Sequence, residues 1–307
     1  MQEQFRGAIL GLAIGDALGW PTEFLKLPQI KAKYGPQGIT ELPPRPALFT
    51  DDTQMSLAIA HALLEAGHQD LDTLMTHVTE HFVAWLISPE NNKAPGNACL
   101  EGTRKLQRGI DWRRSGSIHS KGCGSAMRSA PIGLYYHRDP ARLREVAIAT
   151  GVATHNHPTA NAGSVATAYL VKLALDRVPP ADMLGHLLDF CGDLSPEFNA
   201  ALKKVPVVMG REPEAAMAEL GEGWVAEEAI ALALYCFLCS PDNYPATVRR
   251  AANSNGDSDS IACIAGAISG ARNGLSAIPS DWVEHIEKSD HLLSVADRLW
   301  EACQHED

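Results

Sequence analysis

The sequence has no apolar run of the kind that a membrane-spanning helix needs. Such a helix takes roughly 20 consecutive apolar residues, and no segment of this chain has that length and apolarity. Met1–Arg6 lacks a convincing basic segment, and Asp16 interrupts the apolar stretch that follows. We therefore expect neither a signal peptide nor a membrane partner.

The chain also lacks an excess of basic residues. Its 26 Lys and Arg stand against 37 Asp and Glu, which gives a formal net charge of −11. This sign argues against broad binding to nucleic acid or to an anionic membrane. It does not exclude one phosphorylated ligand held in a pocket.

Cysteines are few and show no pairing pattern. There are seven, an odd number, and most stand in apolar helical contexts. Cys236 and Cys239 form a CxxC, but the surrounding segment is apolar, which favours buried thiols over a redox pair. A chain without disulfides suits a reducing compartment, so we expect a cytoplasmic protein.

Aromatic residues make up only 6% of the chain, and alternating β-branched runs that would demand a sheet are missing. Hydrophobic residues reach 45%, with abundant Ala and Leu, which favours closely packed helices. Composition offers no place to divide the chain, so we predict one compact, all-α domain over residues 1–307, built as an orthogonal helical bundle. Apolar spacing predicts helices over about Phe5–Leu18, Met55–Glu65, Leu71–Leu86, Ala98–Arg108, Arg142–Thr150, Asn161–Leu175, Ala181–Cys191, Ala226–Cys239, Pro245–Ala252, Ser260–Arg272 and Ser289–Gln304.

Two acidic clusters near opposite ends of the chain, Thr50–Thr53 and Asn255–Ser260, are its most informative feature. Each places carboxylates and hydroxyls in a short polar segment that runs into an apolar helical pattern. Mg²⁺ and Mn²⁺ prefer such oxygen ligands. Four carboxylates at one point would repel each other unless cations lay between them. The clusters therefore predict a metal site at helix ends, with enough carboxylates for two ions. The alternative is that each acidic pair only caps its helix.

Three further patterns are weaker. Gly122–Ala126 resembles a backbone-amide cradle for phosphate, or it is an ordinary glycine-rich turn. His155 and His157 stand in a loop closed by Pro158, either as packed or capping imidazoles or as partners of a ribose or phosphate. The helix segment His77–His81 has the spacing of an inverted zinc-protease motif. A solvated helix face explains that segment better, because no third ligand is evident.

Together these segments resemble the ADP-ribosylglycohydrolase family, including the dinitrogenase-reductase-activating glycohydrolases. The order of the motifs is preserved from near residue 5 to about residue 282. The matching segments are Gly7–Gly19, Glu23–Phe24, Thr50–Met55, Pro95–Asn97, Gly124–Pro131, Thr154–Pro158 and Gly256–Ser260.

The resemblance implies an all-α fold with two Mg²⁺ or Mn²⁺ ions at the base of an ADP-ribose cleft. Glu23 matches a family glutamate near the metals, and Glu23 or an aspartate (Asp51, Asp52 or Asp259) is the expected proton carrier. The implied metal ligands are Thr50, Asp51, Asp52, Asp257, Asp259 and Ser260. The implied diphosphate cradle is Gly122, Cys123, Gly124, Ser125, Ala126 and Met127. Gly96, Asn97, His155 and His157 are the implied further contacts to ADP-ribose.

The chain departs from the family pattern at three positions. Ser260 stands where many members have Thr, which keeps the hydroxyl. Cys123 stands where Asn is common, so we expect its side chain to make no strong hydrogen bond. Ala94 stands near where nitrogenase-reductase-activating members carry an Asp, which weakens the case for nitrogenase reductase as the target.

These patterns lead us to expect a metal-dependent hydrolase that removes ADP-ribose from an acceptor, with ADP-ribosylated arginine on protein favoured. The alternatives are a hydrolase of another linkage, to serine, nucleic acid or a small molecule, and an ADP-ribose-binding module without catalysis. A module of that kind should have lost ligands, and here every carboxylate is present. Nucleic acid enters this reading only as a modified substrate.

Overall fold

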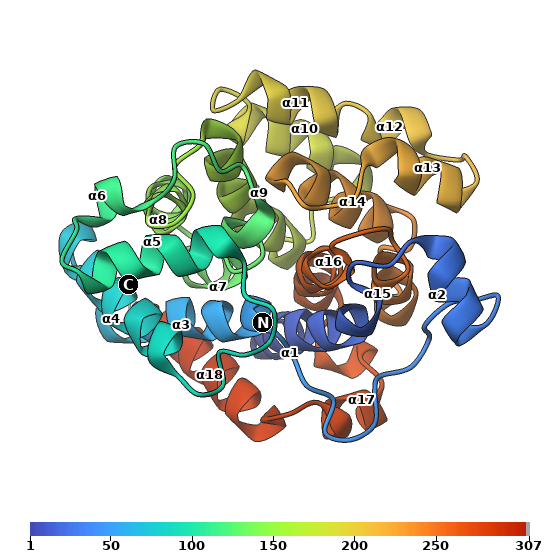
Figure 1. The fold of residues 1–307 in the computed structure, drawn as a ribbon, viewed down its shortest axis with the longest axis horizontal. Coiled ribbons are helices and arrows are strands. Elements are labelled where there is room, and N and C mark those ends of the chain that lie inside the picture. The colour runs from blue at the N-terminus through green and yellow to red at the C-terminus, as the bar shows by residue number, and fades with distance from the viewer. Residues whose placement is uncertain (305–307) are drawn as a thin grey trace.

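Two helices pack backbone against backbone at the centre of the molecule. The structure is a computed structural model that describes residues 1–304. In it, α1 (Gln2–Gly19) lies along α16 (Ser258–Asn273) (Figure 1). A Cβ on Gly11 would lie 2.5 Å from the carbonyl oxygen of Gly266, and one on Gly266 would lie 2.1 Å from that of Gly11. Only glycine allows this approach, so the seam fixes where the two ends of the chain meet.

The remaining helices surround this central pair. Figure 1 shows α9 and α14 on one side of it, α3 and α18 on the other, and α10 to α13 at the rim. Three short 3-10 helices span Trp20–Thr22, Cys123–Ser125 and Leu275–Ala277. The other α-helices are α2 (Leu27–Tyr34), α3 (Asp51–Ala66), α4 (Leu71–Ile87), α5 (Asn97–Gln107), α6 (Trp112–Ser115), α7 (Ala130–Tyr135), α8 (Pro140–Val152), α9 (Pro158–Leu175), α10 (Pro180–Cys191), α11 (Pro196–Leu202), α12 (Val205–Val208), α13 (Pro213–Leu220), α14 (Ala226–Leu238), α15 (Tyr244–Ala252), α17 (Ser280–His285) and α18 (Ser289–Ala302).

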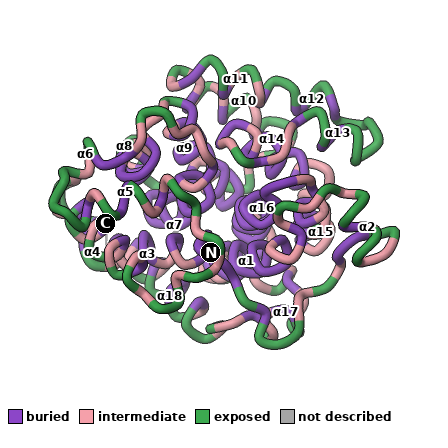
Figure 2. The backbone as a smooth tube through the Cα atoms, in the orientation of Figure 1, coloured by how far each residue is buried: buried purple, intermediate pink, exposed green. Residues whose placement is uncertain are grey.

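One hydrophobic core extends from Phe5 to Cys303. Figure 2 shows the buried backbone concentrated in α1, α16 and α14, with exposed segments around the periphery. Within residues 1–304 β pairing is confined to three isolated bridges and no strand forms, so the all-α prediction is confirmed. The same residues contain no helix whose length and apolarity suit a bilayer crossing.

The predicted helices are all present, with ends that differ by a few residues. The largest difference is at α3, which begins at Asp51 and not at Met55, and α9 begins at Pro158 and not at Asn161. His157 caps it by accepting from the Thr159 N–H, and Pro158 occupies the first turn, where a missing N–H costs nothing. Short helices such as α2 and α7 escape the sequence pattern because they hold too few apolar repeats. All seven cysteines are free.

Candidate metal centre and ligand cleft

The two acidic clusters meet at the N-termini of α3 and α16. Thr50 caps α3 and places Asp51 and Asp52 in its first turn. Asp257 stands at the cap position of α16, with Asp259 in the first turn. The positive end of each helix dipole favours these negative charges. Both sequence interpretations thus hold locally, since the acids do stand at helix N-termini.

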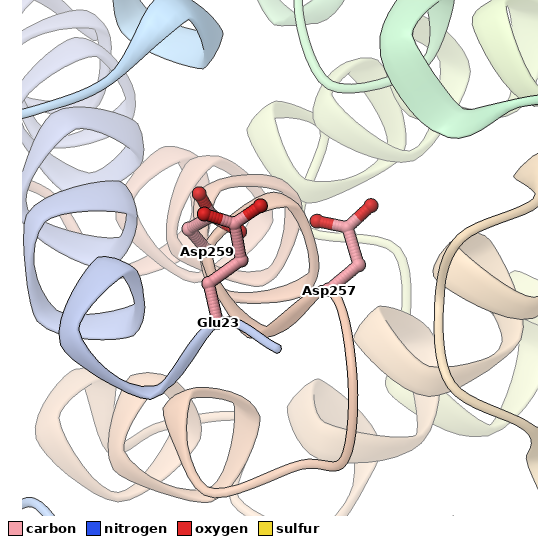
Figure 3. Close-up of side chains that lie close together, drawn as sticks. All are labelled: Glu23, Asp257 and Asp259. Atoms are coloured by element: carbon pink, nitrogen blue, oxygen red, sulfur yellow. The ribbon is translucent and has the colours of Figure 1, made fainter. Parts of the chain in front are cut away.

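Helix capping alone does not explain why the carboxylates of the two clusters converge. Ligand atoms of Glu23, Asp257 and Asp259 all lie within 4.8 Å of one another, and Figure 3 shows these three side chains converging from the segment after α1 and from the start of α16. Asp51 and Asp52 line the same cavity as these three side chains and Ser260. Residues from both ends of the chain therefore form one oxygen-rich site.

The charges in this site oppose one another strongly. Burial, then the charge of Asp16, raises the pKa of Asp51 to about 8. Burial, then the charges of Asp257 and Asp51, raises the pKa of Glu23 to about 8. The pKa of Asp259 is raised well above its ordinary value, first by burial and then by Asp52 and its other acidic neighbours. An opposite charge is the direct way to keep such a cluster ionised.

Two carboxylate oxygens in the site have no protein partner. Asp52 Oδ2 and Asp259 Oδ1 are buried and accept no hydrogen bond within the described part of the chain. Leaving buried acceptors unpaired costs about 1–3 kcal/mol each, which a hard cation would offset. The donor set, carboxylates with hydroxyls, suits Mg²⁺ or Mn²⁺. The residues present fit such a metal.

Asp16 supports this site, although the sequence analysis placed it only within a family-matching segment. It is fully buried and accepts hydrogen bonds from the backbone N–H and hydroxyl of Thr50 and from those of Thr53. Burial outweighs these bonds and raises the pKa of Asp16 to about 6. Its carboxylate therefore fixes the turn that presents Asp51 and Asp52. The signal available in the sequence was an acidic residue inside an otherwise apolar helical segment.

A cavity of about 390 Å³ opens beside the acidic cluster. One wall is the turn after Lys121, and His155 lies against it, since a Cβ on Gly124 would lie 3.3 Å from His155 Nε2. The Gly124 N–H has no acceptor among the described residues. The expected site residues that line the cavity are Glu23, Asp51, Asp52, Gly96, Asn97, Gly122, Cys123, Gly124, Met127, His155, Asp257, Asp259 and Ser260.

Four expected site residues lie outside the cavity lining. Thr50 is buried behind the cluster as the cap of α3. Ser125 donates its hydroxyl to the Ala160 carbonyl, and Ala126 is fully buried. His157 is the cap of α9. Their expected contacts with metal or ligand remain predictions.

Cys123 differs from our expectation. Its thiol lies 2.7 Å from Asp257 Oδ2 and 3.7 Å from the Ser260 hydroxyl. The thiol therefore donates to a carboxylate of the acidic cluster, and the expectation of no strong hydrogen bond was wrong. Ala94 lines the cavity with a positive φ of 53° and brings no carboxylate there.

An aromatic pair that the sequence analysis missed stands at the cavity mouth. Phe24 and Trp224 stack with ring centroids 5.1 Å apart, and their residues remain 64% and 37% exposed. Phe24 follows Glu23 directly and has a φ of 65°, a backbone conformation that is strained for a bulky residue. Exposed, strained aromatics beside a cavity are characteristic of binding sites.

The zinc-protease spacing in α4 has a local explanation. His77 Nδ1 and His81 Nε2 each lie 3.0 Å from the same oxygen of Glu65, on the surface of the α3–α4 pair. These surface contacts agree with the solvated-face interpretation.

The model of the ADP-ribosylglycohydrolase family matches residues 1–307. The chain belongs to the ADP-ribosylglycohydrolase family. It is 29% identical to the ADP-ribosyl-[dinitrogen reductase] glycohydrolase of Rhodospirillum rubrum, covering 92% of this chain and 89% of that protein. It is 25% identical to the ADP-ribosylarginine hydrolase Tri1 of Serratia proteamaculans, over 99% and 81%.

A solved structure confirms the fold of the family. The match to an "ADP-ribosylglycohydrolase-related protein complex" has a TM-score of 0.77 and 28% identity, and it covers 98% of both chains. The family resemblance inferred from the sequence motifs is thereby confirmed. The protein is an ADP-ribosyl glycohydrolase, a hydrolase that removes ADP-ribose.

Proposed function

We propose that this enzyme hydrolyses the bond between C1 of the distal ribose of ADP-ribose and a guanidinium nitrogen of a modified arginine, on protein or on a small molecule. The observation that carries the proposal is the convergence of Glu23, Asp257 and Asp259 with the α3 acids beside a glycine-rich cavity wall. The products are ADP-ribose and the unmodified arginine.

Two Mg²⁺ or Mn²⁺ ions are the proposed cofactors, held by Thr50, Asp51, Asp52, Asp257, Asp259 and Ser260. Bound there, they would supply positive charge that polarises water and orients the ribose hydroxyls. Asp16 holds the α3 turn in place for that role through its bonds to Thr50 and Thr53.

Glu23 is the proposed proton carrier. It is partly exposed, lines the cavity and lies among the other acids. Water attacks C1, the C1–N bond breaks with its electron pair going to nitrogen, and one water proton passes to the Glu23 carboxylate. The nitrogen of the departing guanidine takes up that proton from Glu23, which returns to the carboxylate, so that the charge balances. Asp51, Asp52 and Asp259 are the alternative carriers.

The cavity mouth supports an arginine acceptor over the alternatives. The faces of Phe24 and Trp224 attract a planar cation, with about 0.5–1 kcal/mol gained at an exposed site. The neighbouring acids and the net charge of −11 act in the same direction. A serine or nucleic-acid linkage offers no cation to this surface.

The deciding experiment presents the protein with ADP-ribose linked to arginine, to serine and to nucleic acid, with Mg²⁺ and with EDTA. We expect turnover of the arginine linkage only with metal. Asp259→Ala should abolish it and weaken Mn²⁺ binding while helix content stays nearly unchanged. Full activity in EDTA would contradict metal dependence. Faster turnover of another linkage would show that the enzyme acts on that acceptor instead. ADP-ribose binding without any turnover would indicate a binding module.

Acceptor choice has its own matched pair of variants. Trp224→Ala should raise KM for the arginine-linked substrate roughly threefold or more, whereas Trp224→Phe keeps an aromatic face and should stay near the parent value. An equal loss in both variants, or a loss that is the same for serine-linked substrate, would contradict guanidinium recognition by this pair.

A further inference from the structure

A buried arginine beside the cleft has no carboxylate partner. Arg128 is fully buried between the glycine-rich turn and α7. No ion pair joins it to an acid within residues 1–304. Its guanidinium lies over the Phe82 ring at 4.6 Å, and Nη1 approaches only two sulfur atoms, of Met55 and Cys99. Burying a charge in this way is costly, so its retention needs a reason.

Arg128 is connected to His155 by hydrogen bonds through the Thr154 hydroxyl. Nη2 donates to the Thr150 carbonyl at 2.8 Å and to the Thr154 hydroxyl at 2.7 Å. The same hydroxyl oxygen lies 2.7 Å from His155 Nδ1. Three groups are thus connected in one line, from a permanent cation through a hydroxyl to an imidazole in the cavity wall.

The direction of each proton in this chain follows from what each group can do. A guanidinium only donates, so the Thr154 oxygen is an acceptor toward Arg128. The hydroxyl keeps one proton, and His155 Nδ1 is the only acceptor found for it in the described structure. Nδ1 must then be unprotonated, which leaves the proton of the neutral ring on Nε2.

The Nε2 edge of His155 faces the cavity. A Cβ on Gly122 would lie 3.4 Å from Nε2, and one on Gly124 would lie 3.3 Å from it. No group of the described chain accepts from Nε2, and His155 lines the cavity. Burial, followed by the positive charge of Arg128, lowers the pKa of His155 to about 3, in agreement with a neutral ring.

We propose that Arg128 and Thr154 are positioning residues that hold His155 as the Nε2–H tautomer, aimed at an oxygen of the ligand's diphosphate above the Gly122–Gly124 turn. This inference rests on the proposed function for the identity of the ligand. A neutral N–H donor suits a site that already carries many acids nearby. The opposite tautomer would present a lone pair to the phosphate and repel it.

The tautomer is tested first in the ligand-free protein, independently of any activity. Nitrogen-15 NMR of histidine-labelled protein distinguishes a ring protonated on Nε2 from one protonated on Nδ1, and His155→Gln identifies the signal by its loss. We expect the Nε2–H form for the parent protein. A ring protonated on Nδ1, or on both nitrogens at neutral pH, would overturn the proposal.

Thr154→Val and Thr154→Ser form the matched pair for the positioning role. Valine keeps the shape but removes the hydroxyl, so we expect a mixture of tautomers and a roughly tenfold higher Kd for ADP-ribose, equivalent to about 1.4 kcal/mol. Serine keeps the hydroxyl, so the Thr154→Ser variant should show the single tautomer and the parent's Kd for ADP-ribose. In turnover assays KM should rise in the valine variant with kcat nearly unchanged. A valine variant that retains the single tautomer and the affinity would overturn the proposal.

Binding of different ligands tests whether His155 donates to the diphosphate and not to another part of the ligand. Thr154→Val should weaken ADP-ribose and ADP alike but leave adenosine unaffected, because adenosine lacks the diphosphate. An equal loss for adenosine would move the contact to the nucleoside and contradict the assignment. If the valine variant fails to fold, the NMR result on the parent and the serine variant still decides the tautomer. Failure of all hydrolase assays with normal ADP-ribose binding would contradict the proposed function alone.

Discussion

The Asp16 carboxylate receives both the backbone N–H and the hydroxyl of Thr50, at 2.9–3.0 Å. This pair connects the end of α1 to the start of α3 and repeats at Thr53. The turn that presents Asp51 and Asp52 is therefore built on a buried carboxylate that does not itself line the cavity.

Asp16→Asn should weaken this turn. An amide has only one acceptor oxygen, and its NH₂ group would face the N–H and hydroxyl donors of Thr50 and Thr53. We therefore expect a loss of about 1–3 kcal/mol in the free energy of unfolding and weaker Mn²⁺ binding. Denaturant unfolding and calorimetric Mn²⁺ titration measure the two effects. Asp242→Asn removes an exposed acid, 78% exposed, and is the control. Equal stability and metal affinity in both variants would argue against the positioning role.

Glu23→Gln separates the roles proposed for this residue. The amide conserves shape and removes the proton-carrying group, so kcat should fall by about 10²–10⁴ while ADP-ribose still binds. A residue that only orients the site would show a smaller loss together with weaker metal binding. Kinetics at saturating metal across pH decide between them. Activity within a few-fold of the parent would return the catalytic role to the aspartates.

Gly124→Val should block the glycine-rich wall. The added Cβ would lie 2.8 Å from Cys99 Sγ and 3.0 Å from His155 Cε1, so the wall must shift where the diphosphate is expected. We predict a rise in the ADP-ribose Kd of tenfold or more, about 1.4 kcal/mol. Gly185→Val, where an added Cβ meets nothing within 4 Å, is the matched control. Unchanged affinity in a folded Gly124→Val protein would remove this turn from the site.

The metal-free protein should lose stability as the pH rises. Burial and neighbouring acids raise the pKa of Asp51 and of Glu23 to about 8, whereas both groups titrate near pH 4 in the unfolded chain. Between these values the folded chain binds more protons than the unfolded one, so the free energy of unfolding falls from about pH 4 to about pH 8. Urea unfolding in EDTA at several pH values measures this slope. Asp51→Asn should flatten it, and a rising slope would contradict the assignment.

Local sequence determined most of the helices and the inventory of acids. The apolar residues of α5 and α18 recur at helical spacing because each of these helices buries one face. The carboxylates and hydroxyls at Thr50–Thr53 and Asn255–Ser260 likewise indicated an oxygen-ligand site without coordinates. Helix ends depend on caps such as His157, which the apolar pattern does not record.

Tertiary structure alone decided how those residues work together. The packing of α1 against α3 brings Asp16 beside Thr50, and no spacing along the chain encodes that distance. Cys123 acquires a carboxylate partner, and Phe24 meets Trp224, only because segments remote in sequence converge on one cavity. The arginine–threonine–histidine line follows from hydrogen-bond directions. Local preference acts over a few residues, whereas a site is defined by contacts across the whole chain.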